Sequence, residues 1–147
     1  MSVSLQDWRK NAWVTEHKSS AQEIQGLLAL VERDLGDCRS PQLSADWRFN
    51  IAYNAALQAA TAALAAAGYR AAREAHHYRV IQSLSLTIGA APGTVRQLDA
   101  FRKKRNLASY EVGGRISNQE AEEMAALAEK LREEGQRWIK TNHPALL

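Results

Sequence analysis

The stretch from Ala55 to Ala67 constrains the fold of this chain most, because nearly all of its residues are small and most are alanine. Alanine is the best helix former, and proline, the worst, occurs only three times in 147 residues. The pattern predicts one long helix over 44–67, with Ser44 as its N-cap and Gly68 as its stop. Small side chains let neighbouring helices approach closely, so we expect this helix at the centre of a bundle. Asn54, among apolar neighbours, is expected to need a buried partner.

Helical apolar periodicity marks five further segments. The expected helices run over about 4–15, 20–35, 71–88, 94–110 and 117–141. Three pairs of residues have the spacing of a capping box, in which two side chains bond exposed N–H groups reciprocally: Ser20 and Glu23, Thr94 and Gln97, and Ser117 and Glu120. No strand pattern competes with these helices.

The predicted fold class is therefore all-α, an up-down bundle of about five core helices joined by short loops. Residues 1–18 are expected to form an N-terminal helical addition, and residues 19–147 the bundle domain.

Composition narrows the class of protein. The net charge of +3 and the pI near 9.2 are mildly basic, which is compatible with an anionic partner. Cys38 is the only cysteine, so neither an internal disulfide nor a cysteine-based zinc site can form. Because no secretory signal and no apolar run of membrane-spanning length is found, we expect a cytoplasmic protein away from the membrane. Neither a cofactor nor a metal ion is expected.

A basic residue interrupts the apolar stripe of the helix expected over 94–110. Leu98 and Phe101 begin that stripe, and Arg105 occupies its next position. One interpretation is a structural arginine, paired internally with a carboxylate or with helix carbonyls. The other is a cationic groove for phosphate, whose oxygens match the planar fork of arginine donors. This stretch is the most basic in the chain, since Arg105 follows Arg102, Lys103 and Lys104.

Three segments of the sequence carry a family resemblance. They are the string FRKKRNLASY at 101–110, followed by two glycines and an acidic helix, the segments GYR at 68–70 and HHY at 76–78, and the alanine-rich helix that begins WRFN at 47–50. In helix order and loop placement, residues 20–141 resemble the HEPN family. The resemblance implies a helical bundle that dimerises. It also implies a metal-independent ribonuclease in many members, often a toxin paired with an antitoxin such as a minimal nucleotidyltransferase.

The signature of that family is an arginine, commonly followed by a polar residue, with a histidine a few residues further on. Arg105 matches the arginine and Asn106 its polar neighbour, whereas Ser109, Tyr110 and Glu111 stand where the histidine is expected. The chain looks like a variant branch with tyrosine near this position. Imidazole titrates near neutral pH and tyrosine is a poor base, so the resemblance leaves catalysis open.

The site implied by the resemblance has catalytic and RNA-binding members. The catalytic candidates are Arg105, Asn106 and Tyr110, and the RNA-binding candidates are Arg102, Lys103, Arg105, Ser109 and His77. His77 either replaces the missing histidine or is a satisfied histidine on the apolar stripe of its own helix. We expect Arg105, Asn106, Ser109 and Tyr110 to line a polar cleft at a homodimer interface.

Two functions follow from these residues. The first is a HEPN-type RNA-binding protein, as a ribonuclease toxin or a toxin–antitoxin component, with RNA as ligand and a nucleotidyltransferase-type antitoxin as partner. Any enzyme activity would be that of a metal-independent endoribonuclease. The alternative is a non-enzymatic dimeric helical module that binds a protein partner or a nucleotide.

Overall fold

The computed structural model describes residues 3–110 and 116–147, with side chains for all of these except 107–110. These residues form six α-helices and a two-stranded sheet, which confirms the predicted all-α helical bundle. The elements are α1 (Leu5–Lys10), β1 (Val14–Glu16), α2 (Ala21–Asp37), α3 (Ala45–Ala66), β2 (Tyr69–Ala71), α4 (His76–Gln82), the 3-10 turn η1 (Ser83–Ser85), α5 (Pro92–Tyr110), α6 (Asn118–Asn142) and the 3-10 turn η2 (Pro144–Leu146). Among the described residues, no helix is both long and apolar enough to cross a membrane.

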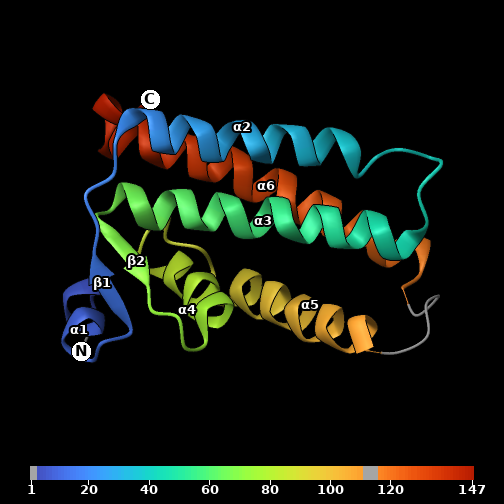
Figure 1. Cartoon of the computed structure of the whole chain (residues 1–147), viewed down its shortest axis with the longest axis horizontal. Helices are drawn as coiled ribbons and strands as arrows, with labels where there is room; N and C mark the ends of the chain where they lie inside the picture. The colour runs from blue at the N-terminus through green and yellow to red at the C-terminus, as the bar shows by residue number, and fades with distance from the viewer. Residues whose placement is uncertain (1–2, 111–115) are drawn as a thin grey trace.

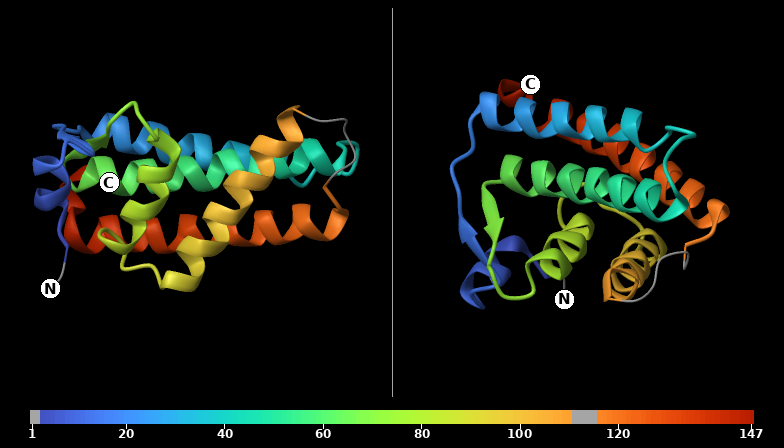
Figure 2. Two further views of the ribbon diagram at one scale, coloured as in Figure 1. Left: turned by 90° about the horizontal axis from the view of Figure 1, so that it is seen from below. Right: turned by 45° about the vertical axis from the view of Figure 1, so that its right-hand side comes forward.

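The long helices α2, α3 and α6 run alongside one another, and α4 and α5 pack beneath α3 (Figure 1). Seen from below, α5 crosses the long helices obliquely (Figure 2). The small sheet and α1 close one end of the bundle. As a result, α3 contacts all of the larger helices.

The alanine-rich α3 is the central helix, as the sequence predicts. All but one of its last eight residues are buried. Its large buried side chains are Phe49, Tyr53 and Leu64. The Ser44 hydroxyl accepts a hydrogen bond from the Trp47 amide at the N-terminus. At the C-terminal end, Gly68 turns the chain out of the helix and into β2. Its φ is +97°, a conformation that glycine adopts without strain.

Asn54 does have a buried partner. Its Nδ2 donates to an oxygen of Asp34 on α2 at 3.0 Å, and Gln58 donates to the same oxygen at 3.0 Å. Arg33 donates to the other oxygen. Asp34 is only 5% exposed, so this shared carboxylate satisfies polar groups between two closely packed helices.

The predicted capping boxes have three different outcomes. The box of Ser117 and Glu120 is confirmed in both directions. Ser20 caps α2, but the Glu23 carboxylate turns to His17 instead of back to the cap. The box at Thr94 is wrong, because α5 already begins at Pro92, whose fixed φ suits a first helical residue. The Thr94 hydroxyl instead accepts a hydrogen bond from Lys130.

The predicted bounds of two helices are also wrong. The first helix ends at Lys10 rather than near residue 15, and the fourth covers only 76–82, followed by η1, rather than 71–88. The released segments pair as antiparallel β1 and β2, with Val14 opposite Ala71. Three-residue strands are too short to show alternation in the sequence. Through this pairing the N-terminal segment adds Trp8 and Val14 to the main core.

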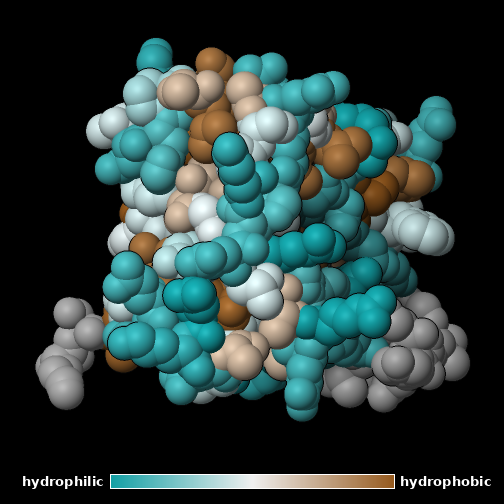
Figure 3. Space-filling view, turned by 60° about the vertical axis from the view of Figure 1, so that its left-hand side comes forward, coloured by the Kyte–Doolittle hydropathy of each residue, from teal (hydrophilic) through white to brown (hydrophobic). Residues whose placement is uncertain are grey.

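The strand end of the molecule presents a mainly hydrophilic surface. On the face drawn in Figure 3, hydrophobic side chains form small areas separated by hydrophilic ones. No broad apolar patch is therefore visible on this face.

Ala75, the N-cap of α4, provides a test of the backbone at this end. Its φ of +53° and ψ of +38° lie in the left-handed region, which costs a non-glycine residue free energy. We expect Ala75→Gly to raise the free energy of unfolding by roughly 0.5–1 kcal/mol. This is the cost of the left-handed conformation to alanine, reduced by the larger conformational entropy that glycine loses on folding. Ala100→Gly, at an exposed position within α5, is expected to lower it by about 1 kcal/mol. Denaturant unfolding measures both, and destabilisation by Ala75→Gly would contradict the backbone account.

Candidate functional site

Side chains from three helices meet around the buried ring of Tyr53. We call Tyr53 of α3, His77 of α4, and Arg102 and Arg105 of α5 the Arg105 cluster. The Tyr53 side chain is 1% exposed, and its hydroxyl lies 3.3 Å from Nδ1 of His77. The Arg105 guanidinium carbon lies 5.0 Å from the centre of the Tyr53 ring. A guanidinium at this distance from a ring is stabilised by a cation–π interaction, so an arginine can occupy the apolar stripe of α5.

The positions of Arg105 and His77 on their helices direct both side chains toward α3. Phe101, one turn before Arg105, packs edge-on against Phe49 with ring centres 5.5 Å apart. This contact turns the face of α5 that carries Arg105 toward α3. His77 lies one turn before the buried Ile81, so it too faces α3 and is only partly exposed.

Burial and positive charge set the protonation of the cluster. Burial raises the pKa of Tyr53 to about 12, against the opposing effect of the Arg105 and Arg102 charges. Burial also lowers the pKa of His77, and the charges of Arg105, His76 and Arg102 lower it further. At neutral pH the cluster therefore combines fixed guanidinium charges with a neutral imidazole and a neutral phenol.

The basic residues before Arg105 point in different directions. Nε of Arg102 donates to Asp99 at 2.8 Å, and its side chain is 19% exposed. Lys103 lies 3.6 Å from the other oxygen of Asp99, but its side chain is 68% exposed. Lys104 pairs with Glu120 of α6. Only Arg102 joins Arg105 in the cluster, and Lys103 extends toward solvent.

Rings and guanidiniums alternate from the cluster to the N-terminal segment. Arg102 lies 5.6 Å from the ring centre of Tyr78, and Arg79 lies 5.5 Å from the same ring. Arg79 also lies 3.9 Å from the centre of the Trp13 ring. Tyr78 is 37% exposed, so the row includes an aromatic face in contact with solvent.

The predicted site residues are partly brought together. Arg102, Arg105 and His77 meet, whereas Lys103 and Asn106 are exposed. The side chains of Ser109 and Tyr110, in the last turn of α5, lie outside the described residues, as does Glu111. The predicted cleft and dimer interface remain predictions.

Tyr53 is the member of the cluster that sequence reasoning missed. The available signal was a hydroxyl-bearing ring on the buried face of an alanine-rich helix, one turn after Phe49. A buried phenol usually bonds a polar partner, here His77.

Comparison of the chain with protein-family models, with curated proteins and with solved structures finds no match in any of the three. Within residues 3–110 and 116–147, no group of three His, Cys, Asp or Glu side chains is placed to hold a metal ion. The chemical groups of the cluster are two guanidiniums, an imidazole and a phenol.

The protonation of His77 tests this geometry. We expect its pKa in the folded chain to lie below the ordinary value of 6.5. Arg105→Gln should raise this pKa by removing a nearby positive charge, yet leave it below the ordinary value, because burial is the largest cause. The chemical shift of the imidazole Cε1 proton, followed against pH, measures the change.

Lys103→Gln serves as the matched control, since Lys103 is exposed and does not contribute to the shift. It should leave the pKa of His77 unchanged. A wild-type pKa at or above the ordinary value would contradict the cluster.

Proposed function

We propose that this chain binds single-stranded RNA and that the Arg105 cluster contacts the phosphate backbone. The observation that carries the proposal is the meeting of Arg102, Arg105 and His77 beside a buried neutral ring. The positive charges that disfavour protonation of His77 also attract an anion to the same place. A phosphodiester fits it, because its oxygens accept the parallel hydrogen bonds that a guanidinium donates.

The pairing of Arg102 with Asp99 leaves other donors of Arg102 available. Asp99 accepts a hydrogen bond from Nε of Arg102, and among the described contacts the terminal nitrogens of Arg102 have no carboxylate partner. One phosphate can therefore approach without displacing Asp99. The pairing with Asp99 also fixes the direction of Arg102, which reduces the entropy lost on binding.

The neighbouring aromatic row favours a single strand over a duplex. Tyr78 is exposed between two guanidiniums, Arg79 and Arg102. Unpaired bases stack on such rings and planes, which are out of reach of the paired bases inside an A-form duplex.

The resemblance to the HEPN family supports the same proposal and extends it. It favours a homodimer in the cytoplasm, with a nucleotidyltransferase-type antitoxin as the partner of a toxin. A non-enzymatic module that binds a protein or a nucleotide is the alternative, and it predicts no RNA binding at the cluster.

Ribonuclease activity is a second candidate function, favoured by the lowered pKa of His77. With Nδ1–H donating to the Tyr53 oxygen, Nε2 of His77 would take the proton of a 2′-hydroxyl as its oxygen attacks phosphorus. Arg105 would stabilise the added charge on phosphorus, and the leaving 5′-oxygen would take a proton from water. The mechanism needs no metal ion, so cleavage should persist in EDTA and disappear in His77→Ala.

RNA binding at two salt concentrations tests the main proposal. We expect the affinity of the wild type for a short single-stranded RNA to fall with salt, because bound phosphates release counterions. Arg105→Ala should weaken binding by roughly tenfold, the value of a charge-assisted hydrogen bond. Fluorescence anisotropy with a labelled oligonucleotide measures both effects.

Lys103→Ala is the control, since Lys103 carries the same charge on the same helix but extends toward solvent. Its effect should be several times smaller than that of Arg105→Ala. Equal effects of the two substitutions, or binding that does not depend on salt, would mean that the cluster is not the RNA contact.

A further inference from the structure

A pocket of about 290 Å³ lies apart from the Arg105 cluster. It is lined by the N-terminal part of α2, the C-terminal half of α3, β2 and α4, and none of its lining residues belongs to the cluster. Small-molecule sites usually measure roughly 300–1,000 Å³, so this pocket suits a small ligand.

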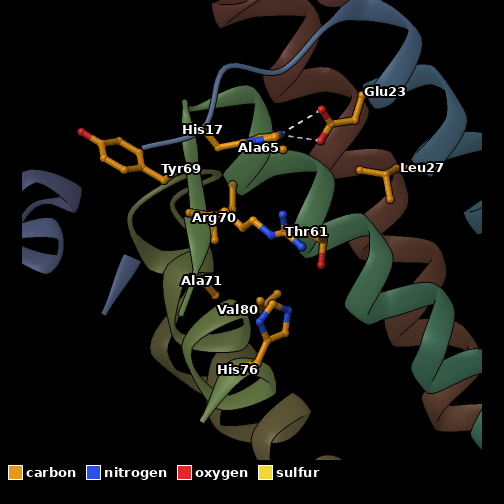
Figure 4. A pocket seen from close by; sticks show the side chains of 11 residues that line it. His17, Glu23, Leu27, Thr61, Ala65, Tyr69, Arg70, Ala71, His76 and Val80 are labelled. Atoms are coloured by element: carbon orange, nitrogen blue, oxygen red, sulfur yellow. Dashed lines mark hydrogen bonds and ion pairs between the residues drawn. The ribbon is translucent and has the colours of Figure 1, made fainter. Parts of the chain in front are cut away.

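Polar groups enter the pocket from two sides. The side chains of Arg70, from β2, and His76, from the start of α4, both point into it (Figure 4). Thr61 faces them from α3, and its hydroxyl donates to the Leu57 carbonyl at 2.8 Å, which leaves the oxygen as an acceptor. The donors directed into the pocket are thus a guanidinium and an imidazole.

The pocket also has an apolar wall. Leu27 of α2, Leu64 of α3 and Val80 of α4 line it. Leu27 is partly exposed, whereas Leu64 and Val80 are almost wholly buried behind it. Such a wall binds the hydrocarbon part of a ligand by removing it from water.

The acidic and the basic side chain at this pocket differ in whether they have a partner. Both carboxylate oxygens of Glu23 lie within 2.9 Å of Nε2 of His17. Within the part of the chain that the structure describes, no carboxylate forms an ion pair with Arg70. The acid of the pocket therefore has a partner in place, whereas the guanidinium is available to a ligand.

We propose that this pocket binds a small organic carboxylate, with its head on Arg70 and His76 and its apolar body against Leu27, Leu64 and Val80. A guanidinium binds a carboxylate through two parallel hydrogen bonds, and an imidazole N–H adds a third. A phosphate dianion would bring a second negative charge toward Glu23, and a bare inorganic anion would leave the apolar wall in water. This proposal does not rest on the proposed RNA contact, because none of the residues that line the pocket belongs to the Arg105 cluster.

Calorimetry on the full chain tests the proposal with hexanoate as the probe. Hexanol, which has the same chain without the charge, and inorganic phosphate, which has charge without the chain, are the comparison ligands. Hexanoate is expected to bind at least tenfold more tightly than either, since hexanol lacks the charged head and phosphate lacks the hydrocarbon chain. Binding of hexanoate should shift the NMR signals of Thr61 and His76.

Two matched variants locate the site. Arg70→Gln should weaken hexanoate binding roughly tenfold or more, by removing charged donors. Arg73→Gln, an exposed arginine three residues on that does not line the pocket, should leave binding unchanged. Both should fold, because the backbone of residue 70 pairs with Thr15 whatever its side chain. His76→Leu, on a different element, is expected to weaken binding as a second check.

Four results would overturn the proposal. Three of them come from calorimetry. They are no binding of hexanoate by the wild type, equal binding of hexanoate and hexanol, and equal losses in Arg70→Gln and Arg73→Gln. NMR shifts confined to His77 and Arg105 would likewise overturn it, by placing the anion at the other site.

Discussion

The near absence of side-chain bulk along the second half of α3 is the constraint on which the rest of the structure depends. Its alanines let α2 and α6 pack along its length, while α4 and α5 cover it from below. Tyr53, in the first half of α3, is a large side chain with a polar group that is also buried. Because a phenol ring needs room and its hydroxyl needs a partner, α4 and α5 present His77 and Arg105 at this point instead of further apolar side chains.

The contacts of Tyr53 with His77 and Arg105 also form the candidate site. The Tyr53 ring stabilises the Arg105 guanidinium through a cation–π interaction. Burial lowers the pKa of His77, and the charges of Arg105, His76 and Arg102 lower it further, so the imidazole is neutral at neutral pH. A fixed cation beside a neutral base is what binding and cleavage of a phosphodiester both need, which is why the two proposed functions share one set of residues.

Local signals in the sequence predict much of this fold. Ser44, Gly68 and the box at Ser117 set the ends of helices through groups within a few residues, so they can be found from spacing alone. The pairing of β1 with β2 joins segments more than fifty residues apart, and no local pattern reveals it. Arg105 and His77 stand out singly because each breaks an apolar stripe. Their common contact with Tyr53 arises only when three helices pack, so the sequence predicts the candidates but not their arrangement.

An NMR titration of the full chain with a short single-stranded RNA observes the cluster itself and so shows whether RNA binds there. We expect RNA to shift the side-chain Nε–H signal of Arg105 and to raise the pKa of His77, since a phosphate beside the imidazole favours its charged form. Binding would then take up a proton and tighten as the pH falls through the ordinary histidine range. RNA that binds while the Arg105 signal and the pKa of His77 stay unchanged would show that the cluster is not the RNA contact.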